Sequence, residues 1–194
     1  MNNNQNVILL TGDPGVGKST IAVNILEKLA SGKKINVEDI FGYNTIRLSN
    51  LAGELEGFEI VTRGGERCLL ASTNCETPHR YMKFFVNAKA FDKTLTSEFE
   101  RAKKHPRPII HIDEIGLMEK VSPGYINMLA DFIRNFNAPM LAIIKYIQND
   151  YFLDYIKAMD NVLLYTITKS NRRTVEREAL KEFSAIIERS GNPS

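Results

Sequence analysis

Short apolar runs alternate along this chain with longer stretches in which apolar residues recur every three or four positions. The short runs have the length of buried strands and cover residues 7–10, 109–112, 140–144 and 162–165. The longer stretches have the period of amphipathic helices and cover residues 20–29, 91–104, 122–133, 150–159 and 174–189. Strands that alternate with helices favour an α/β fold, with a mostly parallel central sheet and helices on both faces.

Some segments add detail to this alternation. Residues 54–71 alternate apolar and polar side chains around Gly64-Gly65, a two-residue turn that is typical of a β-hairpin. We therefore expect an antiparallel hairpin inserted into the sheet at about 54–71, and a further strand at 81–86. The first helix is expected to end near Gly32 in the left-handed conformation. Because the chain carries no repeat or linker, residues 1–194 are predicted to form one domain.

Composition and charge narrow the class of protein. The 194 residues are 43% hydrophobic and 25% charged with a net charge of +2, which is ordinary for a soluble globular protein. Basic residues cluster only in pairs or triplets, so we expect no nucleic-acid partner. No apolar run approaches the roughly 18 residues that span a membrane, and the N-terminus lacks a signal-peptide pattern. We expect a cytoplasmic monomer in which Cys68 and Cys75 are free thiols.

The first apolar run leads into a glycine-rich segment with the phosphate-binding P-loop pattern G-x-x-x-x-G-K-[ST]. The segment follows a predicted strand and opens a predicted helix, the context in which this pattern binds phosphate. Glycines let consecutive backbone N–H groups turn toward one anion, and the positive end of the helix dipole points at the same place. Lys18 is expected to reach the β- and γ-phosphates, and Ser19 to place its hydroxyl on Mg²⁺. The predicted nucleotide-binding residues are Gly12, Asp13, Pro14, Gly15, Val16, Gly17, Lys18, Ser19 and Thr20.

Two carboxylates follow the apolar run at 109–112. An acidic residue at the carboxyl end of a buried strand lies where α/β sheets bind ligands, so Asp113 is predicted to hold Mg²⁺ together with Ser19. Glu114 is predicted to be the general base that deprotonates the attacking water. Without the P-loop, the Asp113-Glu114 pair would fit the cap of the next helix equally well. His111 lies inside the strand and is expected to be a packed core histidine.

A cation near the transferred phosphate is also expected, because negative charge develops there in the transition state. Arg172 follows the last predicted strand and is the best-placed candidate in the sequence. The alternative is that Arg172 and Arg173 form the solvated start of a helix. With this assignment, the predicted catalytic residues are Glu114, Lys18 and Arg172.

In their order along the chain, these segments resemble the cancer-related nucleoside-triphosphatase family of small P-loop NTPases. The resemblance rests on the segments 12–20, 42–45, 57–67, 113–119 and 171–172. It implies a one-domain P-loop NTPase fold related to RecA-type and nucleotide-kinase proteins. It also implies Mg²⁺-dependent hydrolysis of ATP, GTP, CTP, UTP and TTP, with weaker action on diphosphates. The chain departs from the family at Ile46, where an acidic residue is common, and at Leu117, where a basic one is. These departures bear on nucleotide preference.

Three functions fit these motifs. The first is a nucleoside-triphosphate hydrolase, and the second is a kinase that transfers the γ-phosphate to a small acceptor. The third is a nucleotide-gated binding module whose slow hydrolysis times a partner interaction. A kinase needs an acceptor pocket and an arginine-rich lid, and neither is evident. A guanine-selecting N-K-x-D-type motif would favour the gated module, but Asn161 and residues 168–171 do not spell one. The hydrolase is the favoured interpretation.

Overall fold

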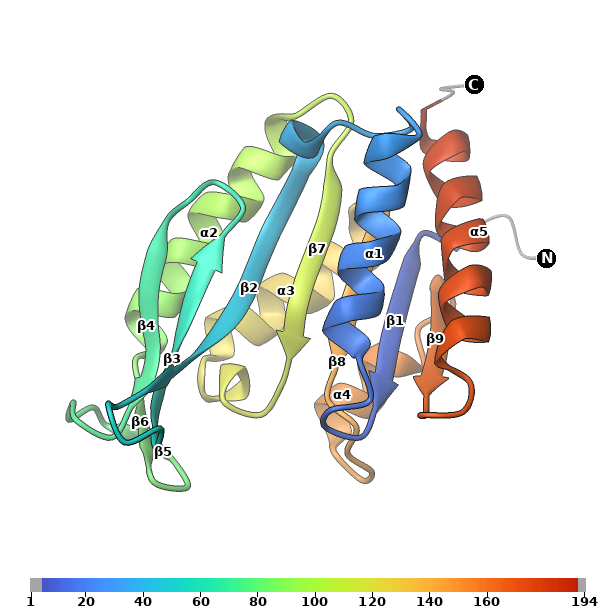
Figure 1. Ribbon diagram of the computed structural model, residues 1–194. Helices are drawn as coiled ribbons and strands as arrows, with labels where there is room; N and C mark the ends of the chain where they lie inside the picture. Colours follow the sequence, from blue (N-terminus) through green and yellow to red (C-terminus); the bar gives the residue numbers. More distant parts are fainter. Residues whose placement is uncertain (1–4, 192–194) are drawn as a thin grey trace.

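The computed structural model describes residues 5–191, which form a nine-stranded sheet with helices on both faces (Figure 1). The strand order across the sheet is β5-β6-β4-β3-β2-β7-β8-β1-β9. The strands are β1 (Val7–Gly12), β2 (Ile40–Ser49), β3 (Leu55–Thr62), β4 (Arg67–Ser72), β5 (His79–Tyr81), β6 (Phe84–Val86), β7 (Ile109–Ile115), β8 (Met140–Ile144) and β9 (Val162–Ile167). The helices are α1 (Lys18–Ser31), α2 (Ala88–Lys104), α3 (Pro123–Asn135), α4 (Tyr151–Lys157) and α5 (Arg172–Ser190), with short 3-10 helices η1 (Val37–Asp39) and η2 (Glu119–Val121).

Five strands form the parallel half of the sheet. β8 pairs in parallel with both β1 and β7, while β2 and β9 extend the parallel set on either side. α1 and α5 cover one face of this half, and α2, α3 and α4 cover the other (Figure 1). The predicted α/β fold is therefore confirmed. Because the strands are parallel, the carboxyl ends of β1, β8 and β7 lie at the same edge of the sheet.

The antiparallel half continues from β2 through β3, β4, β6 and β5. β3 and β4 form the hairpin that was predicted around Gly64 and Gly65. The prediction of a single strand at 81–86 is wrong, because the chain forms two strands there, β5 and β6, which pair with each other. Met82 lies between them with a φ of 53°, a left-handed conformation that reverses the chain. This turn could not be predicted from the sequence, because it contains neither glycine nor proline.

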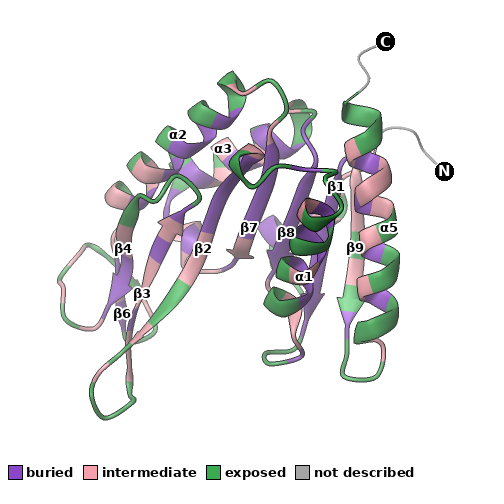
Figure 2. Ribbon diagram, turned by 45° about the horizontal axis from the view of Figure 1, so that its top comes forward, coloured by how far each residue is buried: buried purple, intermediate pink, exposed green. Residues whose placement is uncertain are grey.

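Two hydrophobic cores join the layers. The core on the α2 and α3 side is rich in aromatic side chains, and Tyr43, Phe91 and Tyr125 are fully buried in it. The core on the α1 and α5 side is mainly aliphatic. In Figure 2 the central strands β1, β7 and β8 are buried over most of their length, because helices cover both of their faces. This packing holds the strand ends that carry the candidate site.

Two helix ends show how local chemistry sets the element boundaries. Ser122 caps α3, and its hydroxyl accepts a hydrogen bond from the Tyr125 amide (3.1 Å), as the Ser-Pro start predicts. The left-handed conformation predicted for Gly32 is wrong, since Gly32 has a φ of −78° and Lys33 has a φ of 56°. The Lys34 amide then donates to the carbonyl of Leu29 (2.9 Å), so the chain leaves α1 one residue later than expected.

Two further expectations concern the cysteines and membrane contact. Cys68 and Cys75 are free thiols, as predicted, and each is half-buried. Within residues 5–191, every helix is too short or too polar to cross a membrane.

Candidate active site

The P-loop connects β1 to α1 at the carboxyl edge of the sheet. Gly17 occupies the N-cap of α1 with a φ of 99°, a conformation that glycine adopts without strain. Gly12 ends β1 so close to β9 that an added Cβ would lie 2.2 Å from the carbonyl oxygen of Ile167. Lys18 Nζ donates hydrogen bonds to the carbonyls of Gly12 (2.9 Å) and Asp13 (3.0 Å), which hold its ammonium at the loop. The loop thus combines a lysine ammonium with a helix N-terminus, two features that favour an anion.

Asp113 lies near the carboxyl end of β7 and meets the P-loop through Ser19. The Ser19 side chain lies near enough to the Asp113 carboxylate to lower its pKa, even though β8 separates β7 from β1 in the sheet. Burial is the largest influence on the pKa of Asp113 and raises it, and the charge of Glu114 adds to the rise. The Ser19 contact and the charges of Lys18 and Arg63 lower this pKa and so favour the carboxylate form.

The oxygen atoms of Ser19 and Asp113 suit a magnesium ion. A carboxylate and a hydroxyl are hard ligands, and Mg²⁺ is usually bound by one or two carboxylates together with water and substrate phosphates. Across residues 5–191, no cluster of three or more His, Cys, Asp or Glu side chains could hold a metal by itself. One carboxylate and one hydroxyl supply only part of a coordination shell, so these side chains fit an ion that shares its coordination with a nucleotide.

Glu114 has neighbours from β2 and from the residue that follows β8. The β7–β8 register shifts in the last residues of β7, so the strand is irregular where the carboxylates lie. Lys145 Nζ lies 3.3 Å from Glu114 Oε1, and the Tyr43 hydroxyl donates a hydrogen bond to the Glu114 carbonyl (3.4 Å). The Glu114 side chain is 28% exposed, so a water molecule can reach its carboxylate.

Close to Glu114, the η2 residue Glu119 carries a buried carboxyl group. Glu119 is 1% exposed, and its Oε2 atom has no hydrogen-bond partner within the described part of the chain. A Cβ added at Gly116 would lie 2.9 Å from that oxygen and 3.5 Å from Glu114 Oε1, so the two carboxyl groups flank this glycine. Burial, with help from the charge of Glu114, raises the pKa of Glu119 to about 7, whereas Lys145 lowers it. In the sequence, Glu119 stands out only as part of the family pattern.

His111 is the packed core histidine that the sequence predicts. It is 1% exposed, and its Nδ1 lies 3.0 Å from the carbonyl oxygen of Leu141 on the neighbouring strand. Burial lowers the pKa of His111 to about 4, and the positive charge of Arg63 contributes to the decrease. His111 is therefore neutral near pH 7 and adds no charge to the site.

Besides Lys18, the cations that lie near the two carboxylates are residues that the sequence did not predict. Arg172, the predicted catalytic arginine, begins α5 after β9, on the side of β1 that faces away from β7. Its contact with phosphate stays a prediction. Sequence reasoning missed Lys145 and Arg63, which the strand order brings near the two carboxylates. No local pattern could have revealed them, because their proximity depends on which strands are neighbours.

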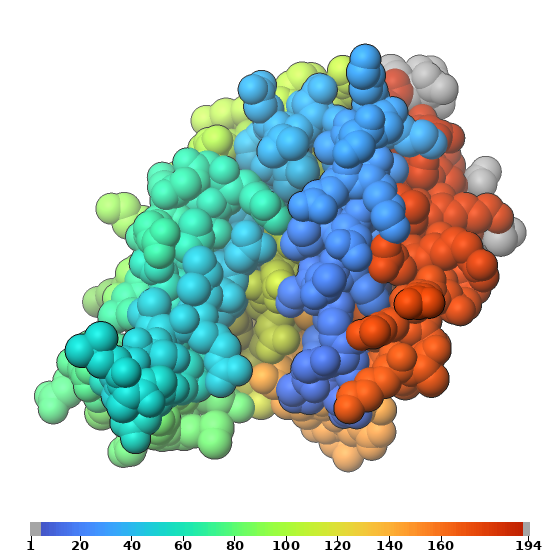
Figure 3. Space-filling model, in the orientation of Figure 1, coloured from blue at the N-terminus to red at the C-terminus, as the bar shows by residue number. Residues whose placement is uncertain are grey.

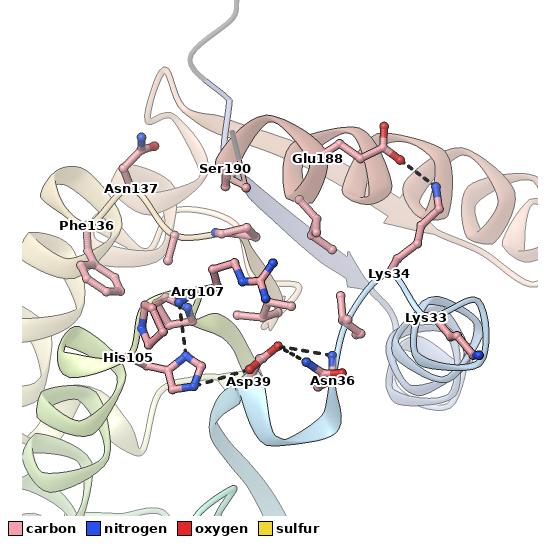
Figure 4. A pocket seen from close by; sticks show the side chains of 18 residues that line it. Lys33, Lys34, Asn36, Asp39, His105, Arg107, Phe136, Asn137, Glu188 and Ser190 are labelled. Atoms are coloured by element: carbon pink, nitrogen blue, oxygen red, sulfur yellow. Dashed lines mark hydrogen bonds and ion pairs between the residues drawn. The ribbon is translucent and has the colours of Figure 1, made fainter. Parts of the chain in front are cut away.

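A cavity of about 940 Å³ lies at the opposite, amino edge of the parallel strands (Figure 4). Its walls carry a contact between His105 Nε2 and Asp39 Oδ1 (3.5 Å) and an ion pair between Lys34 and Glu188 (2.7 Å). In Figure 3, β7 (yellow) is visible at the base of a furrow between α1 and β2. The residues with catalytic chemistry therefore lie away from this cavity.

Comparison with known proteins agrees with this arrangement. A family model described as NTPase matches residues 7–180, a range that includes the P-loop and both carboxylates. The chain belongs to this NTPase family. The match confirms the family resemblance that the motifs indicate. The matched residues extend from β1 into α5.

Individual relatives match along nearly their whole length. The nucleoside-triphosphatase THEP1 of Thermotoga petrophila is 32% identical over 173 residues, which cover 89% of this chain and 90% of the relative. THEP1 of Methanocaldococcus jannaschii is 31% identical over 188 residues, with coverages of 92% and 97%. The crystal structure of THEP1 from Aquifex aeolicus superimposes with a TM-score of 0.73 at 26% identity, covering 91% of this chain and 98% of that one. The solution structure of a human cancer-related nucleoside triphosphatase gives a TM-score of 0.72 at 24% identity, with coverages of 92% and 97%, and shares the fold.

Proposed function

We propose that this NTPase-family chain hydrolyses nucleoside triphosphates to nucleoside diphosphates and inorganic phosphate in a Mg²⁺-dependent reaction. The observation that carries the proposal is the placement of the P-loop, between β1 and α1, at the same edge of the sheet as Asp113 near the end of β7, with Ser19 near the Asp113 carboxylate. Glu114 follows Asp113 directly, and its side chain is 28% exposed. A phosphate cradle, two oxygen ligands and a carboxylate base are the groups that hydrolysis of a phosphoanhydride requires.

Binding begins with the triphosphate at the N-terminus of α1. Backbone N–H groups of the loop donate to phosphate oxygens, and the helix dipole favours the negative charge. Lys18 exchanges its bonds to the carbonyls of Gly12 and Asp13 for bonds to the β- and γ-phosphates, so its ammonium stays hydrogen-bonded throughout. Ser19 and Asp113 would hold Mg²⁺, which would neutralise charge on the phosphate oxygens.

Glu114 then accepts a proton from the attacking water. The water oxygen forms a bond to the γ-phosphorus while the bond from that phosphorus to the β–γ bridging oxygen breaks in line. The diphosphate leaves with the bridging oxygen, and the proton on Glu114 passes to solvent. Lys18 stabilises the charge that develops on the phosphate oxygens, and we retain Arg172 as a further cation for the same purpose.

We propose that the enzyme accepts ATP, GTP, CTP, UTP and TTP. The P-loop binds phosphates through its backbone and Lys18, and these contacts are the same for every base. Diphosphates are weaker substrates because they lack the γ-phosphate next to Glu114. The name nucleoside-triphosphatase, which the relatives carry, likewise specifies no base.

Other parts of the proposal rest on composition. We propose that residues 1–194 act as one domain and as a cytoplasmic monomer, without a nucleic-acid partner. The near-neutral net charge of +2 and the ordinary hydrophobic content support this view.

The experiment that tests the function measures phosphate release from each nucleoside triphosphate with Mg²⁺, with and without nucleoside and monophosphate acceptors. A rate of phosphate release that does not depend on the acceptor and varies little among bases supports a hydrolase of broad base specificity. A slow background that one acceptor converts into a phosphorylated product would assign a kinase instead. Lys18→Ala serves as the control for a contaminating phosphatase, since its turnover should be lost.

A further inference from the structure

Lys145 is the first residue after β8, the strand that lies between β1 and β7. Its backbone amide donates a hydrogen bond to the carbonyl of Ile115 (3.0 Å), which extends the pairing of Ile115 with Ile144 by one residue. β1 leads into the P-loop, and β7 carries Asp113 and Glu114 near its end. The hydrogen bond therefore fixes the Lys145 backbone between the two segments that carry the proposed chemistry.

The Lys145 side chain lies against Glu114. Nζ is 3.3 Å from Glu114 Oε1, and the two side chains are 43% and 28% exposed, so the ion pair borders solvent. Within residues 5–191, no other lysine or arginine forms an ion pair with Glu114. The positive charge of Lys145 also lowers the pKa of the buried Glu119 carboxyl.

We propose that Lys145 contacts the γ-phosphate of a bound nucleoside triphosphate while it stays paired with Glu114. An ammonium has three N–H donors, so one can remain on Glu114 while another binds a phosphate oxygen. A carboxylate and a phosphate repel each other, and a cation between them holds the base next to the phosphorus that is attacked. The same contact stabilises negative charge in the transition state. The inference rests on the proposed hydrolysis and adds to it a cation that touches the substrate.

Two other cations, Lys18 and Arg172, occupy different positions. Lys18 is bound to carbonyls of the P-loop itself, on the β1 side. Arg172 begins α5 beyond β9, which is also on the far side of β1 from Glu114. Of these three cations, Lys145 is the one that contacts the proposed base. It is therefore suited to the terminal phosphate rather than to the phosphates that the loop encloses.

A binding experiment separates this contact from a structural role. In a Glu114→Gln background, turnover is expected to be slow enough for equilibrium binding of ATP and ADP with Mg²⁺ to be measured. Adding Lys145→Gln should weaken ATP binding about tenfold, the loss of one phosphate contact, and leave ADP binding within about twofold. A structural disturbance would weaken both nucleotides. Equal losses for ATP and ADP, or unchanged ATP binding, would overturn the inference.

The matched control is Lys103→Gln in the same background. Lys103 is 41% exposed and pairs with Glu100 at 2.8 Å on α2, so it resembles Lys145 in exposure and pairing but lies outside the site. Its loss should leave the affinities for ATP and ADP unchanged. If Lys103→Gln weakened ATP binding relative to ADP binding as much as Lys145→Gln does, net charge would explain the effect. That result would contradict a contact between Lys145 and the γ-phosphate.

Kinetics of the single variants give a second readout. Lys145→Gln should lower kcat about 10²-fold, the effect of removing one preorganised donor to the reacting group. Lys145→Arg keeps the cation and should recover at least a tenth of the wild-type kcat. If the wild type hydrolyses ATP and Glu114→Gln does not, a normal kcat in Lys145→Gln refutes the Lys145 contact alone. A wild type that releases no phosphate from any nucleotide refutes the proposed hydrolysis and this inference with it.

Discussion

Replacing Glu119 with glutamine tests the description of the buried carboxyl group beside Glu114. Glu119 is 1% exposed, and burial raises its pKa from 4.5 to about 7, with the charge of Glu114 adding to the shift. In the native protein, the carboxyl keeps its proton over a pH range in which the unfolded chain has lost it. Glu119→Gln keeps the shape of the side chain and removes the titration.

The sign of the effect follows from proton binding. Between pH 4.5 and about 7, the native state holds a proton at Glu119 that the unfolded state does not, so the free energy of unfolding falls as the pH rises. The loss is complete above the native pKa and amounts to about 3 kcal/mol for a shift of this size. Glu119→Gln lacks this loss. Its stability relative to wild type should therefore rise by about 3 kcal/mol as the pH increases through this range.

His111 works in the opposite direction. Burial lowers its pKa from 6.5 to about 4, so between these values the unfolded chain binds an extra proton and stability is lost as the pH falls. The two trends oppose each other over much of the same range and flatten the wild-type profile. Subtracting the wild-type free energy from that of Glu119→Gln removes the His111 contribution and isolates Glu119.

Urea unfolding at a series of pH values from about 4.5 to about 8, followed by circular dichroism, measures this difference. Leu129→Ala is the control, because it removes a fully buried side chain of α3 without changing a titratable group. Its loss of stability should be the same at every pH. A Glu119→Gln difference that is also constant with pH would refute the conclusion that Glu119 is buried in its neutral form.

Three further predictions follow from the site and from the caps. Lys18→Ala should abolish phosphate release and weaken binding of labelled ATP, because the loop loses its ammonium; wild-type turnover would contradict this role. EDTA should stop phosphate release and added Mg²⁺ restore it, since Ser19 and Asp113 supply ligands for the ion; release that persists in EDTA would argue against a metal. Ser122→Ala removes the cap of α3 and should lower the free energy of unfolding by about 1 kcal/mol, with kcat unchanged. An unchanged urea midpoint would show that the cap contributes little.

The P-loop was predictable because one short segment of the sequence determines both its side-chain chemistry and its backbone conformation. Gly17 has a left-handed conformation that other residues adopt only with strain, and Gly12 lies too close to β9 for a Cβ atom to fit. Lys18 follows at a fixed spacing. The position of Asp113 near the end of a buried strand was predictable because a buried apolar run ends beside it. The β3–β4 hairpin followed from Gly64-Gly65 in the same way. In each case, a few neighbouring residues determine the local structure.

Lys145 and Glu119 were not predictable in that way. Lys145 follows an ordinary apolar run, and it meets Glu114 because β8 lies between β1 and β7. Hydrophobic periodicity predicts which face of a strand is buried but not which strands are neighbours. Glu119 is buried by packing around η2, although glutamate is usually exposed. The turn at Met82 was missed because no glycine or proline marks its left-handed residue.

The central claim is that Glu114 serves as the base of a hydrolytic site built on the P-loop. The most direct measurement compares Glu114→Gln with wild type for Mg²⁺-dependent phosphate release and for ATP binding. Glu114→Gln should keep ATP binding and lower the rate 10²-fold or more, the contribution typical of a general base. A Glu114→Gln protein that hydrolyses ATP at the wild-type rate would contradict it.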